Sequence, residues 1–174
     1  TELWDNYAYY IKAVLPEAEK HGIKLALHPD DPPIAKLGEV SRIMISAENM
    51  EKAVRTVADS PSLGLTFCQA TYHMMGEDLY KVIPRLTDKI MFVHFRNAAG
   101  TKEDFRETFH DNGELDMPRL LRLYRDCGVD VPIRVDHVPT MAGETVRNAG
   151  YDALGRLYAL GYLRGIMETV DKET

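Results

Sequence analysis

Short runs of consecutive apolar residues alternate along the chain with longer stretches in which apolar residues recur every three or four positions. The first pattern is typical of strands buried on both faces, and the second of helices that bury one face. The short runs predict strands at residues 23–28, 63–68, 90–95 and 131–136. The longer stretches predict helices at residues 2–20, 46–58, 77–86, 117–127 and 151–170.

Residues that favour caps and turns mark the ends of several of these elements. Gly22 and Gly128 follow two predicted helices, where a left-handed residue often terminates a helix. Ser46 and Asp116 each stand at the start of a predicted helix, where their side chains are expected to accept hydrogen bonds from its first turn. The polar segment 96–116 is predicted to be a loop.

The order of these elements is one helix followed by repeated strand–helix units. Such alternation predicts an α/β fold with a parallel sheet and right-handed crossovers. No strand leads into a Gly-x-Gly-x-x-Gly turn or a phosphate-binding loop, which argues against the nucleotide-binding versions. The alternative is a TIM (β/α)₈ barrel, which needs about 250 residues. With 174 residues and four units, the chain would be about half of such a barrel, in a single domain over residues 1–174.

Composition narrows the class of protein. The chain is 45% hydrophobic and 28% charged, and its formal net charge is −6, whereas nucleic-acid-binding modules usually carry a basic patch. It contains no run of about 18 apolar residues, so no membrane span is expected. The first residues lack the pattern of a signal peptide, and the two cysteines are too few for a disulfide framework. We therefore expect a cytoplasmic protein without nucleic-acid or membrane partners.

Each predicted strand ends in a side chain that can bind a metal: His28, Cys68, His94 and Asp136. Taken singly, a buried histidine, a small apolar cysteine or a loop-capping aspartate would explain each of them. Because the carboxyl ends of parallel strands meet on one face, the set predicts a shared metal site. Its ligand types suit zinc, iron(II) or cobalt(II), and manganese tolerates imidazole.

Further polar residues follow the predicted ligands closely. His137 is either a hydrogen-bonding support or a proton-transfer group. Arg96 and Asn97 follow His94, and Arg96 is either a surface ion pair or a substrate contact. In the loop, His110 and Asp111 precede an Asn-Gly turn, and His110 is either solvated or part of the site.

Several longer motifs make the sequence resemble the mannonate dehydratase family. They are His28-Pro29-Asp30-Asp31-Pro32-Pro33, Phe67-Cys68-Gln69, Val93-His94-Phe95-Arg96-Asn97, Glu107-Thr108-Phe109-His110-Asp111-Asn112-Gly113, Asp136-His137-Val138-Pro139-Thr140-Met141-Ala142-Gly143-Glu144, and the segment from Gly150-Tyr151 to Gly155-Arg156-Leu157. The resemblance implies a TIM barrel related to xylose-isomerase-like sugar enzymes, with this chain as its C-terminal half. Ala70 departs from the pattern, since the family usually has glycine after Cys-Gln.

The resemblance also implies an activity: removal of water from D-mannonate to give 2-dehydro-3-deoxy-D-gluconate in glucuronate catabolism, with a divalent metal, typically Mn²⁺. It implies His28, Cys68, His94 and Asp136 as metal ligands. It also implies proton-transfer groups at His137 and Tyr151. The elimination needs a base for the C2 proton, an acid for the C3 hydroxyl, and stabilisation of charge on the carboxylate.

Two details of this mechanism are expectations about single residues. The proton of Tyr151 is expected to become more labile beside the positive charge of a bound metal. Arg96 is expected to hold a carboxylate or hydroxyl of the sugar acid with its planar guanidinium, and Asn97, His110 and Asp111 are expected to contribute further substrate contacts.

Two other functions remain open from the sequence. Metal-bound histidine and aspartate also support hydrogen shifts, so a sugar isomerase or epimerase on the same scaffold is one alternative. A catalytically incomplete, metal-binding barrel fragment is the other, because half a barrel leaves strand edges uncovered. A homo-oligomer is expected, although the apolar run 158–163 is predicted to cover the sheet within one subunit.

Overall fold

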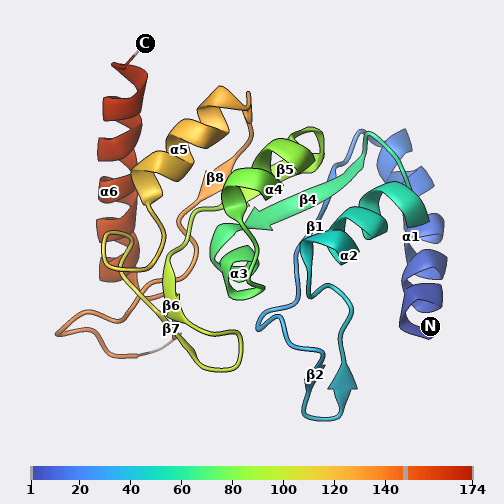
Figure 1. Ribbon diagram of the computed structural model, residues 1–174, viewed down its shortest axis with the longest axis horizontal. Coiled ribbons are helices and arrows are strands. Elements are labelled where there is room, and N and C mark those ends of the chain that lie inside the picture. The colour runs from blue at the N-terminus through green and yellow to red at the C-terminus, as the bar shows by residue number, and fades with distance from the viewer. Residues whose placement is uncertain (1, 147–148, 174) are drawn as a thin grey trace.

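A four-stranded parallel sheet forms the centre of the molecule (Figure 1). The computed structural model describes residues 2–146 and 149–173. The strand order is β1 (Leu25–Leu27), β4 (Leu63–Cys68), β5 (Ile90–His94) and β8 (Ile133–Arg134), and every neighbouring pair is parallel. The register places Cys68 opposite His94. The parallel α/β arrangement predicted from the alternation of patterns is confirmed.

The predicted helices are also present. They are α1 (Glu2–Lys20), α2 (Ala47–Glu51) with its π-helical continuation (Lys52–Val57), α4 (Leu79–Leu86), followed by a 3₁₀ turn (Thr87–Lys89), α5 (Met117–Asp126) and α6 (Ala153–Asp171). The side chains of Ser46 and Asp116 accept hydrogen bonds from the backbone N–H groups of Asn49 and Arg119, as their capping positions predict. Gly22 and Gly128 follow α1 and α5 with φ values of 65° and 70°, in the left-handed region that glycine adopts without steric cost.

Three small elements were not predicted. They are the hairpin β2 (Lys36–Leu37) and β3 (Val40–Ser41), the short helix α3 (Gln69–Met74), and the hairpin β6 (Ala98–Gly100) and β7 (Phe105–Glu107). The segment 96–116 is therefore not simply a loop. Strands of two or three residues are too short to show a hydrophobic period, so contacts with other parts of the chain decide them. One such contact is the hydrogen bond from the backbone N–H of Gly100 to the Glu114 carboxylate.

Several boundaries also differ from the prediction. β1 covers only Leu25–Leu27, so His28 follows the strand. β8 covers only Ile133–Arg134, so Asp136 lies two residues beyond the strand. α6 begins at Ala153, so Tyr151 precedes the helix and belongs to the connection that leads into it. The glutamate Glu144 accepts a hydrogen bond from the backbone N–H of Leu154 in the first turn of α6, which anchors this connection.

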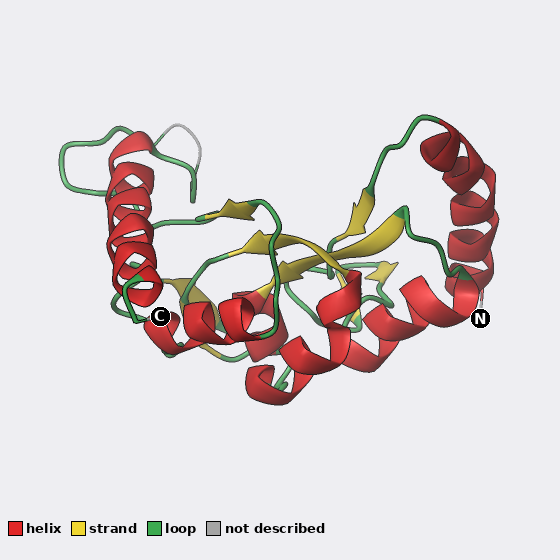
Figure 2. Ribbon diagram, turned by 90° about the horizontal axis from the view of Figure 1, so that it is seen from above, coloured by secondary structure: helices red, strands yellow, loops and turns green. Residues whose placement is uncertain are grey.

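The helices cover one side of the sheet, and the other side is open between α1 and α6 (Figure 2). The main apolar core lies between the sheet and the helices, and on β4 it includes Leu63, Leu65 and Phe67. β1 and β8 are the two edges of the sheet and do not pair with each other, so the described residues form an open sheet and not a closed barrel.

The last helix is only partly covered. Ala159 and Leu163 of α6 are buried in the core, whereas Leu157 and Leu160 are 68% and 48% exposed. The predicted covering role of the run 158–163 is therefore confirmed for one face of the helix only. Within the described residues, no helix has the length and apolar character needed to cross a membrane.

Candidate metal centre

The carboxyl ends of the four parallel strands lie at the same end of the sheet. One of the predicted metal ligands lies at or just after the carboxyl end of each strand. His28 directly follows β1, Cys68 ends β4, and His94 ends β5. One ligand atom from each of these three residues lies within 4.8 Å of the others. Asp136 joins them, because its Oδ2 atom lies 3.3 Å from Nδ1 of His94. The structure therefore gathers three of the four residues in one cluster, and Asp136 lies against one member of it, His94.

The two imidazoles are oriented with nitrogen atoms facing each other. Nε2 of His28 lies 3.1 Å from Nδ1 of His94. Nδ1 of His28 lies 2.7 Å from the carbonyl oxygen of Pro29, to which it donates its proton, and this leaves Nε2 of His28 with a lone pair directed at the cluster. Burial lowers the pKa of His94, but its hydrogen bonds to Asp136 and Cys68 raise the pKa by more.

Asp136 supplies a buried carboxylate, one oxygen of which accepts no hydrogen bond from the described residues. Its φ of 61° lies in the left-handed region, which aspartate tolerates better than most residues. Burial raises its pKa, but the hydrogen bond from His94 and the charges of His137, His94 and Arg96 outweigh burial and hold the pKa at about 2. The carboxyl group is therefore ionised at neutral pH. Its Oδ1 atom is buried and has no hydrogen-bond partner among the described residues.

Cys68 completes the donor set with a sulfur that other elements hold in place. Its side chain is fully buried. The hydroxyl of Thr71 in α3 donates to its Sγ atom at 3.0 Å, and Nη1 of Arg96 lies 3.8 Å from the same atom. Two imidazole nitrogens, one thiol sulfur and one carboxylate with an unpartnered buried oxygen fit a divalent transition metal. The chemistry of these residues is thus compatible with the metal site that the sequence predicts.

Arg96 is a buried cation beside this cluster. Its Nη1 atom lies 2.5 Å from Oδ2 of Asp31 and 3.8 Å from Oδ2 of Asp136, and its Nε atom lies 3.0 Å from Oε2 of Glu107. Burial lowers its pKa, but the negative charges of Cys68, Glu107 and Asp31 raise the pKa by more. The surface ion pair considered for Arg96 is therefore wrong, because this side chain is buried. Its Nη2 atom has no hydrogen-bond partner among the described residues, so its contact with substrate stays a prediction.

The structure places Asn97 and His110 in supporting positions. Asn97 uses its whole amide within the protein: Nδ2 donates to the carbonyls of His110 and Leu115, and Oδ1 accepts from the N–H groups of Ala98 and Leu115. His110 is buried and donates from Nε2 to the carbonyl oxygen of Val135, and burial lowers its pKa. Both residues thus hold the backbone next to the cluster, and the solvated alternative for His110 is wrong.

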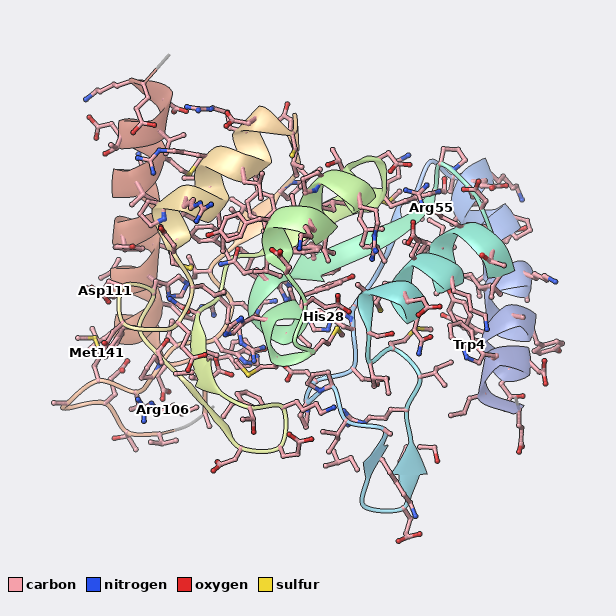
Figure 3. The ribbon with its side chains drawn as sticks, viewed as in Figure 1. Trp4, His28, Arg55, Arg106, Asp111 and Met141 are labelled. Atoms are coloured by element: carbon pink, nitrogen blue, oxygen red, sulfur yellow. The ribbon has the colours of Figure 1, made fainter. Side chains whose placement is uncertain are left out.

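Asp111 lies apart from the cluster. Figure 3 shows it beside Met141 at the edge of the molecule, whereas His28 lies near the centre. Asp111, Met141 and Tyr158 contribute to the lining of a surface hollow of about 320 Å³. A substrate contact by Asn97, His110 or Asp111 is therefore a prediction that the arrangement of these side chains does not favour.

The two predicted proton-transfer residues are in direct contact. Nε2 of His137 lies 2.6 Å from the hydroxyl oxygen of Tyr151, and Nδ1 of His137 lies 3.0 Å from Oε1 of Glu107. Burial and the charge of Asp136 raise the pKa of Tyr151, and the opposing charges of Arg134 and Arg96 are too weak to reverse this. The lability of the Tyr151 proton was expected from a metal beside it, so this expectation stays a prediction.

Two carboxylates that contact Arg96 were not singled out from the sequence. Asp31 and Glu107 lie within the quoted motifs, but both are loop or short-hairpin positions without periodicity. The sequence carried no signal for them. A buried arginine needs carboxylate partners, but the burial of Arg96 is known only from the structure.

The fold and the site together define the class: an open parallel α/β sheet with a cluster of potential metal ligands at the carboxyl ends of its strands. Solved structures agree with this fold. The mannonate dehydratase of Streptococcus suis serotype 2 matches with a TM-score of 0.90 and 31% identity, over 98% of this chain and 50% of that chain. A D-tagatose 3-epimerase-like protein matches with a TM-score of 0.74 but only 18% identity, over 99% of this chain and 57% of that chain, and so shares the fold alone.

The chain belongs to the D-mannonate dehydratase (UxuA) family, whose family model matches residues 1–174. The mannonate dehydratase of Streptococcus agalactiae serotype III (strain NEM316) is 37% identical over 177 residues, which are 98% of this chain and 50% of the relative. The mannonate dehydratase of Endomicrobium trichonymphae is 33% identical over 175 residues, covering 98% and 47%. The chain thus spans about half the length of the curated relatives it matches.

Proposed function

We propose that this chain carries the metal site of a mannonate dehydratase, a hydro-lyase that removes water from D-mannonate and gives 2-dehydro-3-deoxy-D-gluconate in glucuronate catabolism. Two findings support the proposal. The chain belongs to the family over its whole length. The four predicted metal ligands also converge at one edge of the sheet, beside a histidine–tyrosine pair.

His28, Cys68, His94 and Asp136 would hold the metal, for which we propose Mn²⁺, with Fe²⁺, Co²⁺ and Zn²⁺ as the alternatives to be compared. When bound, a divalent cation stabilises the negative charge that develops on the substrate carboxylate as the C2 proton leaves. Two features of the donor set support this proposal: Nε2 of His28 faces Nδ1 of His94 within the cluster, and Oδ1 of Asp136 accepts no hydrogen bond from the described residues.

His137 and Tyr151 move the protons in this proposal. One group takes the C2 proton, and the other protonates the departing C3 hydroxyl. The 2.6 Å contact between Nε2 of His137 and the Tyr151 hydroxyl allows a proton to pass between the two groups. The reference pKa of histidine, near 6.5, suits such transfer at neutral pH. Arg96 contributes a fixed positive charge that would attract the acidic sugar.

The convergence of the four ligands next to the His137–Tyr151 pair is the single observation that carries this function. The test is incubation of the purified chain with Mn²⁺ and D-mannonate, followed by detection of a 2-keto-3-deoxy acid. A parallel incubation with ketoses tests the isomerase or epimerase alternative. Mn²⁺ binding without any product would instead support an incomplete metal-binding fragment.

We also propose a cytoplasmic, homo-oligomeric enzyme with no nucleic-acid or membrane partner. The net charge of −6 supports the absence of a nucleic-acid partner. Exposed apolar side chains on α6, among them Leu157 at 68% exposure, offer a surface for association between subunits. Light scattering across a range of protein concentrations tests the oligomer.

A further inference from the structure

Glu107 bridges two functional side chains of the site. Its Oε1 atom lies 3.0 Å from Nδ1 of His137, and its Oε2 atom lies 3.0 Å from Nε of Arg96. One carboxylate oxygen thus makes a hydrogen bond with the ring of His137, and the other makes an ion-pair contact with Arg96 that lacks hydrogen-bond geometry. The Glu107 side chain is 24% exposed, and that of Arg96 only 1%, so the bridge is largely shielded from solvent.

The backbone holds Glu107 in this position. Glu107 ends β7 and pairs with Ala98 of β6 across the hairpin. β6 begins only four residues after His94, the last residue of β5. The side chain of Asn97 ties the base of the hairpin to the carbonyl oxygens of His110 and Leu115. The hairpin that the sequence did not predict thus brings a carboxylate back over the end of β5.

We propose that Glu107 is a positioning residue that decides which ring nitrogen of His137 carries the proton. The proposal rests on the proposed function, since it concerns the proton-transfer pair. A carboxylate facing Nδ1 accepts the Nδ1 proton, so the lone pair of the neutral ring lies on Nε2. Nε2 can then accept a hydrogen bond from the hydroxyl of Tyr151, 2.6 Å away. The positive charge of Arg96, with Nε 3.0 Å from Oε2, favours the ionised carboxylate in this place.

The substitution Glu107→Gln tests this assignment with almost no change of shape. Arg96 can only donate hydrogen bonds, so the single carbonyl oxygen of the glutamine should turn toward it. The amide NH₂ group then faces Nδ1 of His137 and donates to it. The ring proton then lies on Nε2 and points at the oxygen of Tyr151. Nε2 can therefore no longer accept a hydrogen bond from the Tyr151 hydroxyl.

The readout is the ¹⁵N NMR spectrum of the His137 ring in the full chain, recorded over a pH series until the spectrum of the neutral ring no longer changes. We expect the proton on Nδ1 in the wild-type chain and on Nε2 in Glu107→Gln. In dehydration assays we expect kcat to fall about 100-fold or more, with little change in KM or in bound Mn²⁺, because the wrong tautomer leaves the geometry intact. Glu103→Gln is the matched control, since Glu103 is exposed and its ion-pair partner is the neighbouring Lys102.

Two results would overturn the proposal. One is a wild-type spectrum with the proton on Nε2, which needs no variant and holds even if Glu107→Gln fails to fold. The other is a folded Glu107→Gln chain with an unchanged tautomer. Failure of the proposed function is a separate outcome: the wild-type chain would then show no 2-keto-3-deoxy product, while the spectra would still decide the role of Glu107.

Discussion

Nε2 of His137 and the hydroxyl oxygen of Tyr151 lie 2.6 Å apart, although the residues are 14 positions apart in the chain. The backbone between them folds back on itself, since the N–H of Val138 donates to the carbonyl oxygen of Gly150 at 3.0 Å. Neither residue lies in a helix or strand. The contact is therefore made between two irregular segments, the first of which directly follows Asp136, one of the proposed metal ligands.

The first prediction concerns the phenol. Tyr151→Phe removes the hydroxyl that contacts His137 and leaves the ring in place. We expect the rate of D-mannonate dehydration to fall by about 100-fold or more, because positioned acid–base groups typically contribute this much. Bound metal, measured by elemental analysis, should be unchanged. Tyr9→Phe is the control, since Tyr9 lies on α1 and is 81% exposed. Full turnover in either Tyr151→Phe or His137→Ala, with metal bound, would exclude that residue from proton transfer.

The second prediction compares the two cysteines. Cys68→Ser should lower the affinity for Mn²⁺ or Co²⁺ by at least about 10- to 100-fold, since loss of a ligand costs no less than loss of a group that supports one. Cys127→Ser should leave the affinity unchanged, because Cys127 lies at the C-terminal end of α5, away from the cluster. Calorimetric titration with metal measures both. Equal affinities for the two variants would remove Cys68 from the ligand set.

The third prediction concerns an ion pair away from the site. Lys89 is 7% exposed, and its Nζ atom lies 2.5 Å from Oδ1 of Asp59. This hydrogen bond and the charge of Lys89 lower the pKa of Asp59. A carboxylate with a lowered pKa stabilises the fold above its ordinary pKa, and the contribution is lost as pH falls through the folded-state value. Asp59→Asn should therefore lower Tm at neutral pH.

The pH dependence supplies the check on this ion pair. The difference in Tm between wild type and Asp59→Asn should shrink as pH is lowered below about 4, where the wild-type carboxylate becomes protonated. Asp130→Asn, at another exposed aspartate, serves as the control for removal of a negative charge. A Tm difference that is constant from neutral to strongly acidic pH would show that the ionised form of Asp59 contributes nothing.

The fourth prediction compares two glycines. A Cβ atom on Gly113 would lie 2.1 Å from Oδ1 of Asn97 and 2.5 Å from Oγ1 of Thr108, whereas a Cβ atom on Gly161 in α6 would meet nothing within 4 Å. Gly113→Ala should destabilise the fold by about 1–3 kcal/mol, because Asn97 must move. Gly161→Ala should stabilise it by about 0.5–1 kcal/mol, because glycine is unfavourable inside a helix. Urea unfolding measures both, and equal effects would contradict the packing around Asn97.

The convergence of the metal ligands could be predicted because it needs only topology. Once four apolar runs are taken as parallel strands, the residues at their carboxyl ends must lie along one edge of the sheet. His28, Cys68, His94 and Asp136 follow from that rule without knowledge of any side-chain orientation. The caps at Ser46 and Asp116 were likewise predictable, because each depends on a hydrogen bond within a few residues of the chain.

The partners of these residues were not predictable in the same way. In the sequence, Arg96 is a polar residue that follows a predicted strand. Only the structure shows that it is buried between Asp31 and Glu107. Asp31 lies 65 positions before Arg96 in the chain. The hydrogen bonds of Asn97 and His110 also involve distant backbone groups. Such contacts leave no period in the sequence, because each depends on the meeting of two segments that are irregular on their own.

The sequence by itself determined the order of strands and helices, the parallel sheet, and the edge at which the four ligands meet, because hydrophobic periodicity and local capping are properties of neighbouring residues. Only the tertiary structure decided the short hairpins, the burial of Arg96 and the bridge from Glu107 to His137. These features depend on the packing of segments that are distant in the chain. A buried charge such as that of Arg96 needs an ionic partner, but the sequence does not determine which residue provides it.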